Sequence, residues 1–225
     1  MLSADLRYDL KMVFDALRLA EVRSWVFAHS YAFRKAFPYR YVNNIYFDTP
    51  QWDMLGAHLD GEEKRAKVRY RWHGQTWSPS QGQIELKHKQ GNLGYKKQQS
   101  LFGGLILDKR NWTEIIQQLK DQVDAEFQDL FDVFFPVLVN RYRREYYVSA
   151  DKTVRITLDY KMEVFMQIFS SKPNIKHEDI LRNNVVIEIK AEQAYHQKIV
   201  NVLAELPLYS QQHSKYLNGL EYLWA

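Results

Sequence analysis

Residues 64–73 read Lys-Arg-Ala-Lys-Val-Arg-Tyr-Arg-Trp-His, and this stretch decides the fold. Successive side chains of a β-strand point to opposite faces, so Lys67, Arg69 and Arg71 share one face of such a strand. The other face holds Val68, Tyr70 and Trp72. The apolar face can pack under helices, whereas the basic face must meet water or line a wet cavity that holds an anion. The stretch therefore predicts a strand between a hydrophobic core and an anionic guest.

The same alternation of charged and apolar positions recurs along the chain. It appears in Arg7-x-Asp9-x-Lys11, Glu85-x-Lys87-x-Lys89, Arg141-x-Arg143-x-Glu145, Arg155-x-Thr157-x-Asp159 and Glu188-x-Lys190. One such strand would ordinarily be the solvated face of an antiparallel sheet. The whole set differs because several stripes are purely basic, and because arginine is favoured where phosphate oxygens need forked donors. The repeated pattern indicates one shared basic surface.

The order of expected elements favours an antiparallel α+β fold. Strands are predicted at 6–13, 41–47, 64–73, 83–89, 137–149, 153–163 and 185–191, with a further strand or basic loop from Tyr95; helices are predicted at 15–28, 49–61, 111–120, 124–131, 193–206 and 214–223. No βαβ alternation runs through this order. Closing such a sheet gives a barrel of about eight strands, whose bore admits side chains or one small ligand. Like charges packed in that bore are costly unless an anion neutralises them, so a slim polyanion such as a chain of phosphates is the expected guest.

Composition limits the classes to which the protein can belong. The 225 residues are 46% hydrophobic, which is enough for one large domain over 1–225 or for two small ones. The excess of 31 basic over 27 acidic residues is too small to indicate nucleic-acid binding by itself. With no cysteine, no signal-peptide pattern and no long apolar run, we expect a cytoplasmic protein, and a membrane-protein partner stays open.

The acidic residues that lie in phase with the basic ones have two interpretations. Asp9 and Glu145 are each predicted to form an ion pair with a basic residue. Glu188 and Glu85 are better candidates for a hard divalent cation, because Mg²⁺ or Mn²⁺ takes one or two carboxylates together with phosphate oxygens. No Walker-type glycine loop and no kinase signature set occurs in the chain.

Taken together, the motifs resemble a known family. The relevant segments are Arg7-x-Asp9-x-Lys11, Asn44-x-Tyr46-Phe47-Asp48-Thr49, Lys67-Val68-Arg69-x-Arg71, Ile84-Glu85-x-Lys87, Arg141-x-Arg143-x-x-Tyr146, Arg155-x-Thr157-x-Asp159, Glu188-x-Lys190 and Ser214-Lys215-Tyr216. In this order they resemble the VTC domain, the polyphosphate polymerase domain of the triphosphate tunnel metalloenzyme superfamily. The resemblance covers the chain from Leu6 to about Leu223.

The resemblance implies an eight-stranded antiparallel tunnel barrel wrapped by helices, with ATP or polyphosphate inside and Mn²⁺ or Mg²⁺ near Glu188. The residues that it implies act on the transferring phosphates are Arg69, Arg71, Lys87, Arg141, Arg143 and Arg155. Further phosphate contacts are predicted at Lys11, Arg7, Lys89, Lys97, Lys190, Ser214 and Lys215, with Lys96 competing for the place of Lys97. The chain departs from the family at Asp9, where a glutamate is usual and the carboxylate is now one methylene shorter.

These residues lead to one leading hypothesis and three rivals. The leading hypothesis is transfer of the ATP γ-phosphoryl group to a growing polyphosphate chain by a stand-alone, bacterial-type member of the family. The rivals are a triphosphatase or nucleoside triphosphatase on the same barrel, a non-catalytic polyphosphate or nucleotide sensor, and a nucleic-acid-binding barrel. The last predicts steeply salt-dependent binding to oligonucleotides, which a narrow tunnel should not show, so nucleic acid is not an expected partner.

Overall fold

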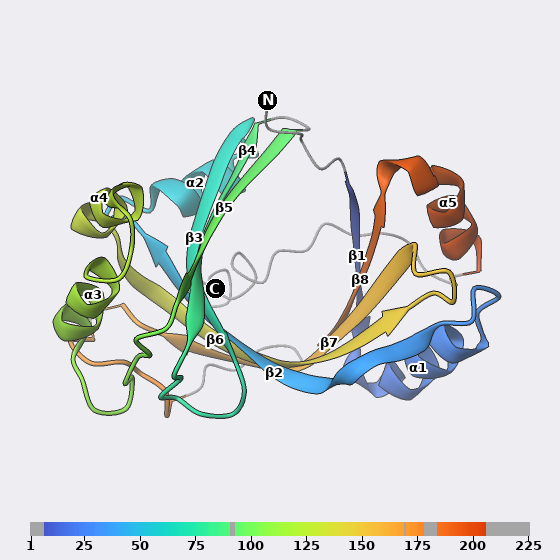
Figure 1. Cartoon of the computed structure of the whole chain (residues 1–225), viewed down its shortest axis with the longest axis horizontal. Helices are drawn as coiled ribbons and strands as arrows, with labels where there is room; N and C mark the ends of the chain where they lie inside the picture. Colours follow the sequence, from blue (N-terminus) through green and yellow to red (C-terminus); the bar gives the residue numbers. More distant parts are fainter. Residues whose placement is uncertain (1–6, 91–92, 169, 178–183, 206–225) are drawn as a thin grey trace. The chain divides into compact units, whose positions relative to one another are not determined.

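A computed structural model describes residues 7–90, 93–168, 170–177 and 184–205 of the chain (Figure 1). The strands are β1 (Arg7–Asp15), β2 (Arg34–Asp48), β3 (Lys64–His73), β4 (Gly82–Gln90), β5 (Leu93–Leu101), β6 (Phe135–Val148), β7 (Val154–Met166) and β8 (Asn184–Glu192). The α-helices are α1 (Leu19–Ala28), α2 (Asp53–Leu59), α3 (Trp112–Lys120), α4 (Ala125–Val133) and α5 (His196–Ala204). Short 3₁₀ turns at Ala16–Arg18 and Gln193–Tyr195 precede α1 and α5. None of the described helices is long and apolar enough to cross a membrane.

The eight strands form one antiparallel sheet in the order β1-β8-β7-β6-β2-β3-β4-β5. The predicted α+β class with an eight-stranded antiparallel sheet is therefore confirmed. Hydrogen bonds do not close the sheet between β1 and β5 in the part of the chain that is described.

The chain forms two compact units that interleave in sequence. Unit 1 comprises residues 1–40, 142–162 and 182–214, and unit 2 comprises residues 41–141, 163–181 and 215–225. Strands β2, β6 and β7 each contribute residues to both units. Each unit has its own hydrophobic core, and each is described separately below.

The core of unit 1 lies between one sheet face and two helices. Buried side chains of β1, β7 and β8, among them Met12, Ile156 and Ile187, cluster with Val26 of α1 and Ile199 of α5. These strand residues occupy the apolar positions of the alternating pattern, so their charged neighbours are turned to the opposite face.

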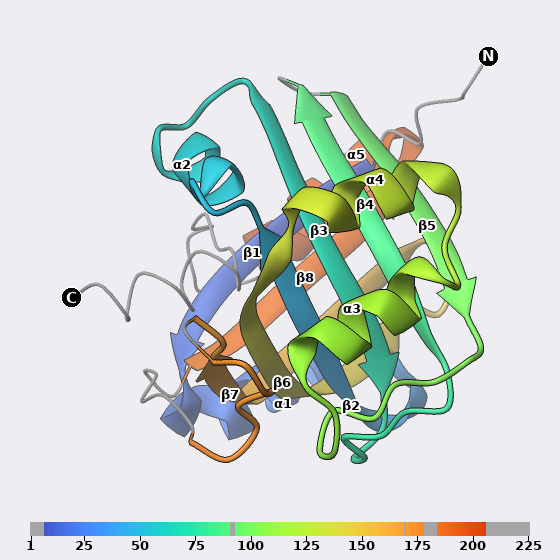
Figure 2. The ribbon, with the colours of Figure 1, turned by 90° about the vertical axis from the view of Figure 1, so that its left-hand side faces the viewer.

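The core of unit 2 follows the same plan with α3 and α4, which lie across the face of β3, β4 and β5 (Figure 2). Trp72 and Ile84 of the sheet cluster there with Ile115 of α3 and Phe127 of α4. Both helices begin where the sequence predicts. Asn111 and Asp124 cap them by accepting hydrogen bonds from the main-chain N–H of Glu114 and Phe127, respectively.

Two predicted boundaries are wrong, and the structure gives the reasons. β2 begins at Arg34 and includes Pro38, which was expected in a loop; its first seven residues are exposed, where a missing N–H donor is tolerated. α2 begins at Asp53 and not at Thr49. Thr49, the predicted cap, still contacts this helix by accepting a hydrogen bond from the N–H of Asp53 at 3.1 Å. Asp48, which was not predicted to act here, accepts hydrogen bonds from the N–H groups of Met54 and Leu55, both at 3.0 Å.

Gly82 offers a test of how tightly the core of unit 2 is packed. A Cβ atom at this position would lie 2.1 Å from the hydroxyl oxygen of Tyr70, a side chain with no exposed surface. We therefore expect Gly82→Ala to lower the free energy of unfolding by about 1–3 kcal/mol in urea titrations.

Gly56 in α2 is the matched control, because a Cβ atom there would meet nothing within 4 Å. We expect Gly56→Ala to be neutral or to raise the free energy of unfolding by up to about 1 kcal/mol. Equal stability of the two variants would contradict the packing described for Gly82.

Candidate functional site

Three lysines lie side by side on the charged face of unit 2. In the antiparallel register, Lys67 of β3 lies opposite Lys87 of β4, and Lys87 lies opposite Lys96 of β5. We call these three residues the lysine row. Residues directly opposite each other on one face are within interaction distance, and like charges in that position are destabilising. The row therefore concentrates positive charge on this face of unit 2.

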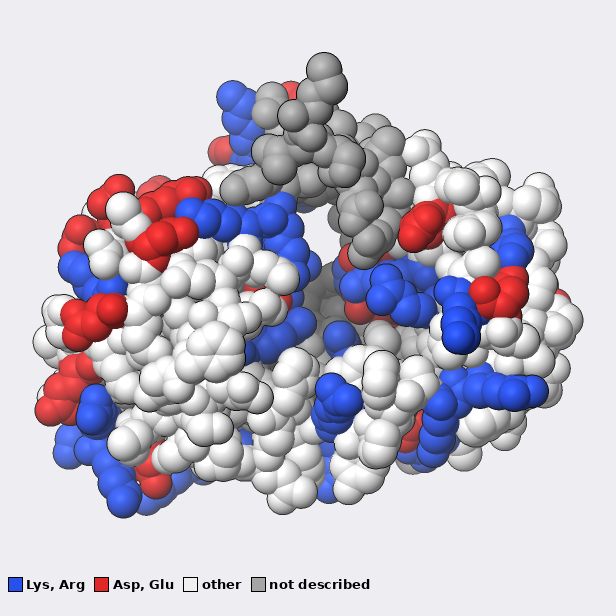
Figure 3. All heavy atoms as spheres, in the orientation of Figure 1, with Lys and Arg blue, Asp and Glu red and all other residues white. Residues whose placement is uncertain are grey.

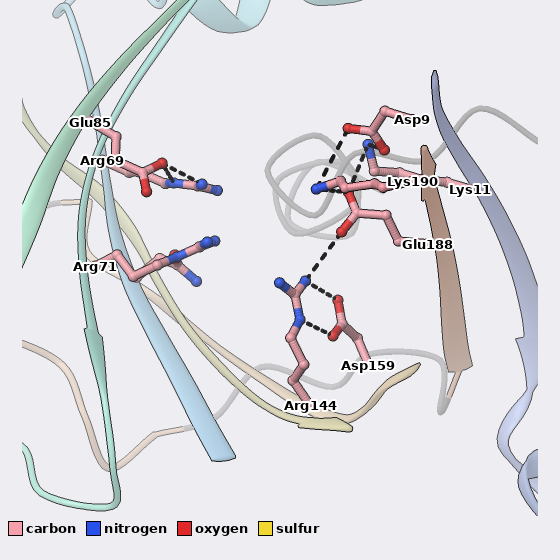
Figure 4. Close-up of polar contacts among 10 residues, drawn as sticks. Asp9, Lys11, Arg69, Arg71, Glu85, Arg144, Asp159, Glu188 and Lys190 are labelled. Carbon is pink, nitrogen blue, oxygen red and sulfur yellow. Dashed lines mark hydrogen bonds and ion pairs between the residues drawn. The ribbon is translucent and has the colours of Figure 1, made fainter. Parts of the chain in front are cut away.

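Next to the lysine row, Arg69 and Glu85 form a buried ion pair. The Nε and Nη2 atoms of Arg69 donate to one Glu85 carboxylate oxygen at 2.8 and 2.5 Å, and the Nζ atom of Lys96 lies 3.5 Å from the other (Figure 4). Burial by itself raises the pKa of Glu85, but the nearby charges of Arg69, Arg71 and Lys96 outweigh it and lower that pKa to about 2. Glu85 is thus ionised, and it acts as the ion-pair partner of Arg69.

Arg71 belongs to a polar chain on the same face. Its Nε atom donates to the Asn44 side-chain oxygen at 2.7 Å, and the Asn44 amide nitrogen donates to Asn140 at 2.7 Å. The Nδ2 atom of Asn140 is buried and has no hydrogen-bond partner among the described residues. A buried donor without a partner is uncommon in native proteins and is compatible with a missing ligand.

Unit 1 contains a second charged cluster, formed by β1 and β8. Asp9 lies opposite Lys190, and Lys11 lies opposite Glu188. The Nζ atom of Lys11 is 3.0 Å from Asp9 and 3.5 Å from Glu188, and that of Lys190 is 3.1 Å from Glu188 (Figure 4). The ion pairing predicted for Asp9 is confirmed.

Arg144 of β6 completes this cluster, although its role was missed in the sequence. It donates two hydrogen bonds to Asp159 of β7 at 2.5 and 2.7 Å, and its Nη2 atom lies 3.6 Å from Glu188. Burial acts to lower the pKa of Arg144, but the charge and hydrogen bonds of Asp159, together with the charges of Tyr142 and Glu188, outweigh it and hold this pKa above its ordinary value. Arg144 is a permanently charged group, fixed in orientation, 12% exposed and adjacent to Glu188.

The carboxylates of Asp9 and Glu188 fit a divalent cation. The pKa of Asp9 is raised, first by burial and then by the charge of Glu188, with which it shares a hydrogen bond. A cation between two oxygen ligands would relieve this repulsion, and one or two carboxylates are what Mg²⁺ ordinarily takes from a protein. Among the described residues, no group of three or more His, Asp or Glu side chains is arranged as a metal site. A metal bound by this pair would need further ligands, such as phosphate oxygens.

The prediction that Arg141, Arg143 and Glu145 share the face of Arg69 is wrong. Arg141 donates to Asn43 at 2.7 Å and lies 3.6 Å from the ring centre of Trp77, on the face that carries Trp72. Arg143 lies over the ring of Tyr39.

Glu145 pairs with Arg23 of α1 at 2.5 Å, so the ion pairing predicted for Glu145 is confirmed. Arg143 and Arg144 are adjacent in β6, so each face of this strand carries an arginine. The alternation of charged and apolar residues could not decide which of the two faces lies with the charged cluster of unit 1.

Lys97 also lies on the helix side of its strand. Its Nζ atom pairs with Asp124 at 2.8 Å and with Glu126 at 2.5 Å at the start of α4, whereas Lys96 points to Glu85. Figure 3 shows acidic side chains gathering where Figure 1 places α4, which explains why a lysine on this side has partners. Of the two competing lysines, the structure puts Lys96 on the face with Glu85.

The remaining predicted residues are placed as follows. Lys87 is exposed in the lysine row, and Arg155 of β7 is exposed opposite Lys190. Arg7 lies opposite Glu192 in the backbone register, and Lys89 lies opposite Arg65. Ser214 and Lys215 lie outside the described residues.

Comparisons with known proteins agree with this fold. The sequence profile of the VTC domain matches residues 6–224. A search of curated proteins finds no match.

Solved structures resemble the chain at low sequence identity. A suspected adenylate cyclase from Vibrio parahaemolyticus has a TM-score of 0.55 at 11% identity, and the match covers 99% of this chain and 100% of that one. A suspected adenylate cyclase from Bacillus halodurans has a TM-score of 0.54 at 12% identity, with 94% and 95% covered. A suspected adenylyl cyclase from Hippeastrum, described as revealing a dominant triphosphatase activity, has a TM-score of 0.51 at 13% identity, with 95% and 94% covered. At these identities the likeness supports the fold alone.

The lowered pKa of Glu85 predicts a specific dependence of stability on pH. The ionised carboxylate stabilises the folded state above the ordinary glutamate pKa of 4.5, and this contribution is lost as the pH falls towards about 2. We expect Glu85→Gln to be less stable than the parent by about 3 kcal/mol at pH 7, with the difference shrinking between pH 4.5 and pH 2.

Urea unfolding over this pH range measures the effect. Glu126→Gln is the control, because Glu126 is exposed and its ion pair with Lys97 should contribute less than about 1 kcal/mol. A difference between the parent and Glu85→Gln that persists unchanged at the acid limit would refute the assignment.

Proposed function

The chain belongs to the VTC domain family, and from this membership we propose that it transfers the γ-phosphoryl group of ATP to a growing polyphosphate chain in the presence of Mn²⁺ or Mg²⁺. The broader part of this proposal, an enzyme that binds a triphosphate, is supported by the family and by the fold shared with the neighbours named above. The acceptor, the metal and the transfer reaction are the proposed part.

The observation on which the proposal rests is the charged face of unit 2. Among the described residues, the lysine row, Arg69 and Arg71 present five cations, and Glu85 pairs with Arg69 and Lys96. Such a face is costly in isolation, and a chain of phosphates would offset the repulsion. Arginine adds forked donors that match phosphate oxygens, and lysine adds point charges.

Unit 1 carries its own group of candidate ligands. Lys11, Lys190 and Arg144 supply cations there, and Asp9 with Glu188 would hold the metal. A bound divalent cation would neutralise charge on the phosphate oxygens. The hydroxyl oxygen of Thr157 is buried without a partner among the described residues and lies opposite Glu188, so it is one further group available to a ligand.

The proposed chemistry needs no nucleophilic side chain. A terminal oxygen of polyphosphate attacks the γ-phosphorus of ATP, the bond from that phosphorus to the β,γ-bridging oxygen breaks, and ADP leaves with the electron pair. The protein's part is to align the two phosphate chains and to stabilise the charge that develops on them. Arg69, Arg71 and Arg144 are fixed by their hydrogen bonds, so they can do this with little reorganisation.

Hydrolysis is the second candidate, because the Hippeastrum structure is described as revealing a dominant triphosphatase activity. The same cations would hold a triphosphate, with water as the acceptor in place of a phosphate oxygen. Incubation with ATP and Mn²⁺ separates the two reactions. A polymerase yields long chains that are visible on a gel, whereas a hydrolase yields free phosphate.

Arg71→Ala tests the role of the charged face. We expect polymer formation to fall at least about a hundredfold, because one oriented donor to developing charge is lost. The melting temperature should stay close to that of the parent, since Arg71 is partly exposed. Polymer yield on gels and thermal unfolding are the two measurements. Unaltered polymer formation would refute the assigned role.

Lys96 and Lys97 form a matched pair for a second test. They are adjacent in β5 but point to opposite faces. The Nζ atom of Lys96 lies 3.5 Å from a carboxylate oxygen of Glu85, whereas Lys97 pairs with Asp124, which caps α4. We expect Lys96→Ala to weaken tripolyphosphate binding roughly tenfold, as expected for loss of a charge-assisted contact, and Lys97→Ala to leave it nearly unchanged. Calorimetric titration measures both affinities. Equal losses, or a larger loss for Lys97→Ala, would contradict this placement of the ligand.

A further inference from the structure

Unit 2 contains a cavity that shares no residue with the charged faces. Its volume is about 590 Å³, and it lies between residues 107–110 and the loop 166–177. We call it the loop cavity. Its described lining includes four cations, Lys109, Arg110, Lys172 and Lys176, and a single carboxylate, that of Asp108. A volume of this size is in the range that holds small ligands.

The loop that forms one wall is held in place by its own side chains. The side-chain oxygen of Asn174 accepts hydrogen bonds from the N–H groups of Lys176 at 3.3 Å and His177 at 3.0 Å. Gln167 accepts from the N–H of Asn174 at 2.8 Å and donates to the Asn174 carbonyl oxygen at 2.8 Å. The N–H of Trp112 donates to Ser171 at 2.9 Å, which ties the loop to α3. The wall is therefore ordered before any ligand arrives, which lowers the entropic cost of binding.

The positive charge of the loop cavity is only partly compensated within the described protein. Among the described residues, Lys172 and Lys176 form no salt bridge, in contrast to Lys97 and Lys120 of the same unit, which pair with Asp124 and Asp132. Asp108, the single carboxylate of the described lining, accepts a hydrogen bond from Ser78 at 2.7 Å, and this bond together with the charge of Lys109 lowers its pKa. An anionic ligand with several charges fits this arrangement.

We propose that the loop cavity is a second binding site for a condensed phosphate chain, a site that grips polyphosphate away from its reacting end. This inference rests on the proposed function, which supplies such a chain. A polyphosphate chain that is held at the loop cavity stays close to the reaction site when its reacting end dissociates, so rebinding of that end is intramolecular. This raises the overall affinity for long polyphosphate without new contacts at the reacting end. The site favours repeated additions to one chain, and it adds nothing for a ligand too short to occupy both sites.

The experiment uses the full chain with the double variant Lys172→Ala and Lys176→Ala, both exposed side chains. We expect its affinity for long polyphosphate to fall roughly tenfold, as two exposed charge contacts are lost, while its affinity for tripolyphosphate stays unchanged. The polymer made from ATP should be shorter at the same rate of ADP release. The control is Arg34→Ala with Lys35→Ala, which removes the same charge from the exposed start of β2 and should change neither quantity.

Other results would overturn the inference in distinguishable ways. If the parent binds long polyphosphate and the loop variant matches it, the loop cavity is not a phosphate-chain site and the proposed function stands. Equal losses of long polyphosphate and single-stranded RNA would instead identify a general polyanion surface. If the parent binds neither polyphosphate nor tripolyphosphate, the proposed function fails together with the inference.

Discussion

The strands that carry the charged clusters pack one face against the hydrophobic core and hold charged side chains on the other, and the two faces cannot be exchanged. The rest of the structure depends on this constraint. In β3, Tyr70 and Trp72 are buried under helices, so Arg69 and Arg71 are turned to the opposite side. The antiparallel register then places Lys67, Lys87 and Lys96 in one row. No local rearrangement can separate these charges, because shifting a strand by one residue would expose its entire apolar face.

This constraint explains how charge is partitioned in both units. On the helix sides, cations such as Lys97 and Arg23 meet acidic partners, Asp124 and Glu145. On the opposite faces, carboxylates are shared: Glu85 interacts with Arg69 and Lys96, and Glu188 interacts with Lys11, Lys190 and Arg144. Shared carboxylates fix the orientation of the cations. That arrangement suits phosphoryl transfer, in which the protein supplies alignment and charge stabilisation.

The proposed metal site follows the same logic. Asp9 lies beside Glu188, and burial, followed by the charge of Glu188, raises the pKa of Asp9. The shorter aspartate at this position still contacts Lys11 at 3.0 Å. Asp9 therefore keeps its charge next to β8.

The sequence by itself determined the strands, the caps of α3 and α4 and the faces of β1, β3, β4 and β8, because period-two alternation and capping are local properties. It did not determine which phase of β6 meets the charged cluster, because Arg143 and Arg144 are equally basic neighbours. The same ambiguity applied to Lys96 and Lys97. Only tertiary structure decided these cases: α1 and α4 bring Glu145, Asp124 and Glu126 to fixed places, and the neighbouring strands bring Asp159 and Glu85 to the other side. Local sequence contains no information on which distant partner a charge will meet.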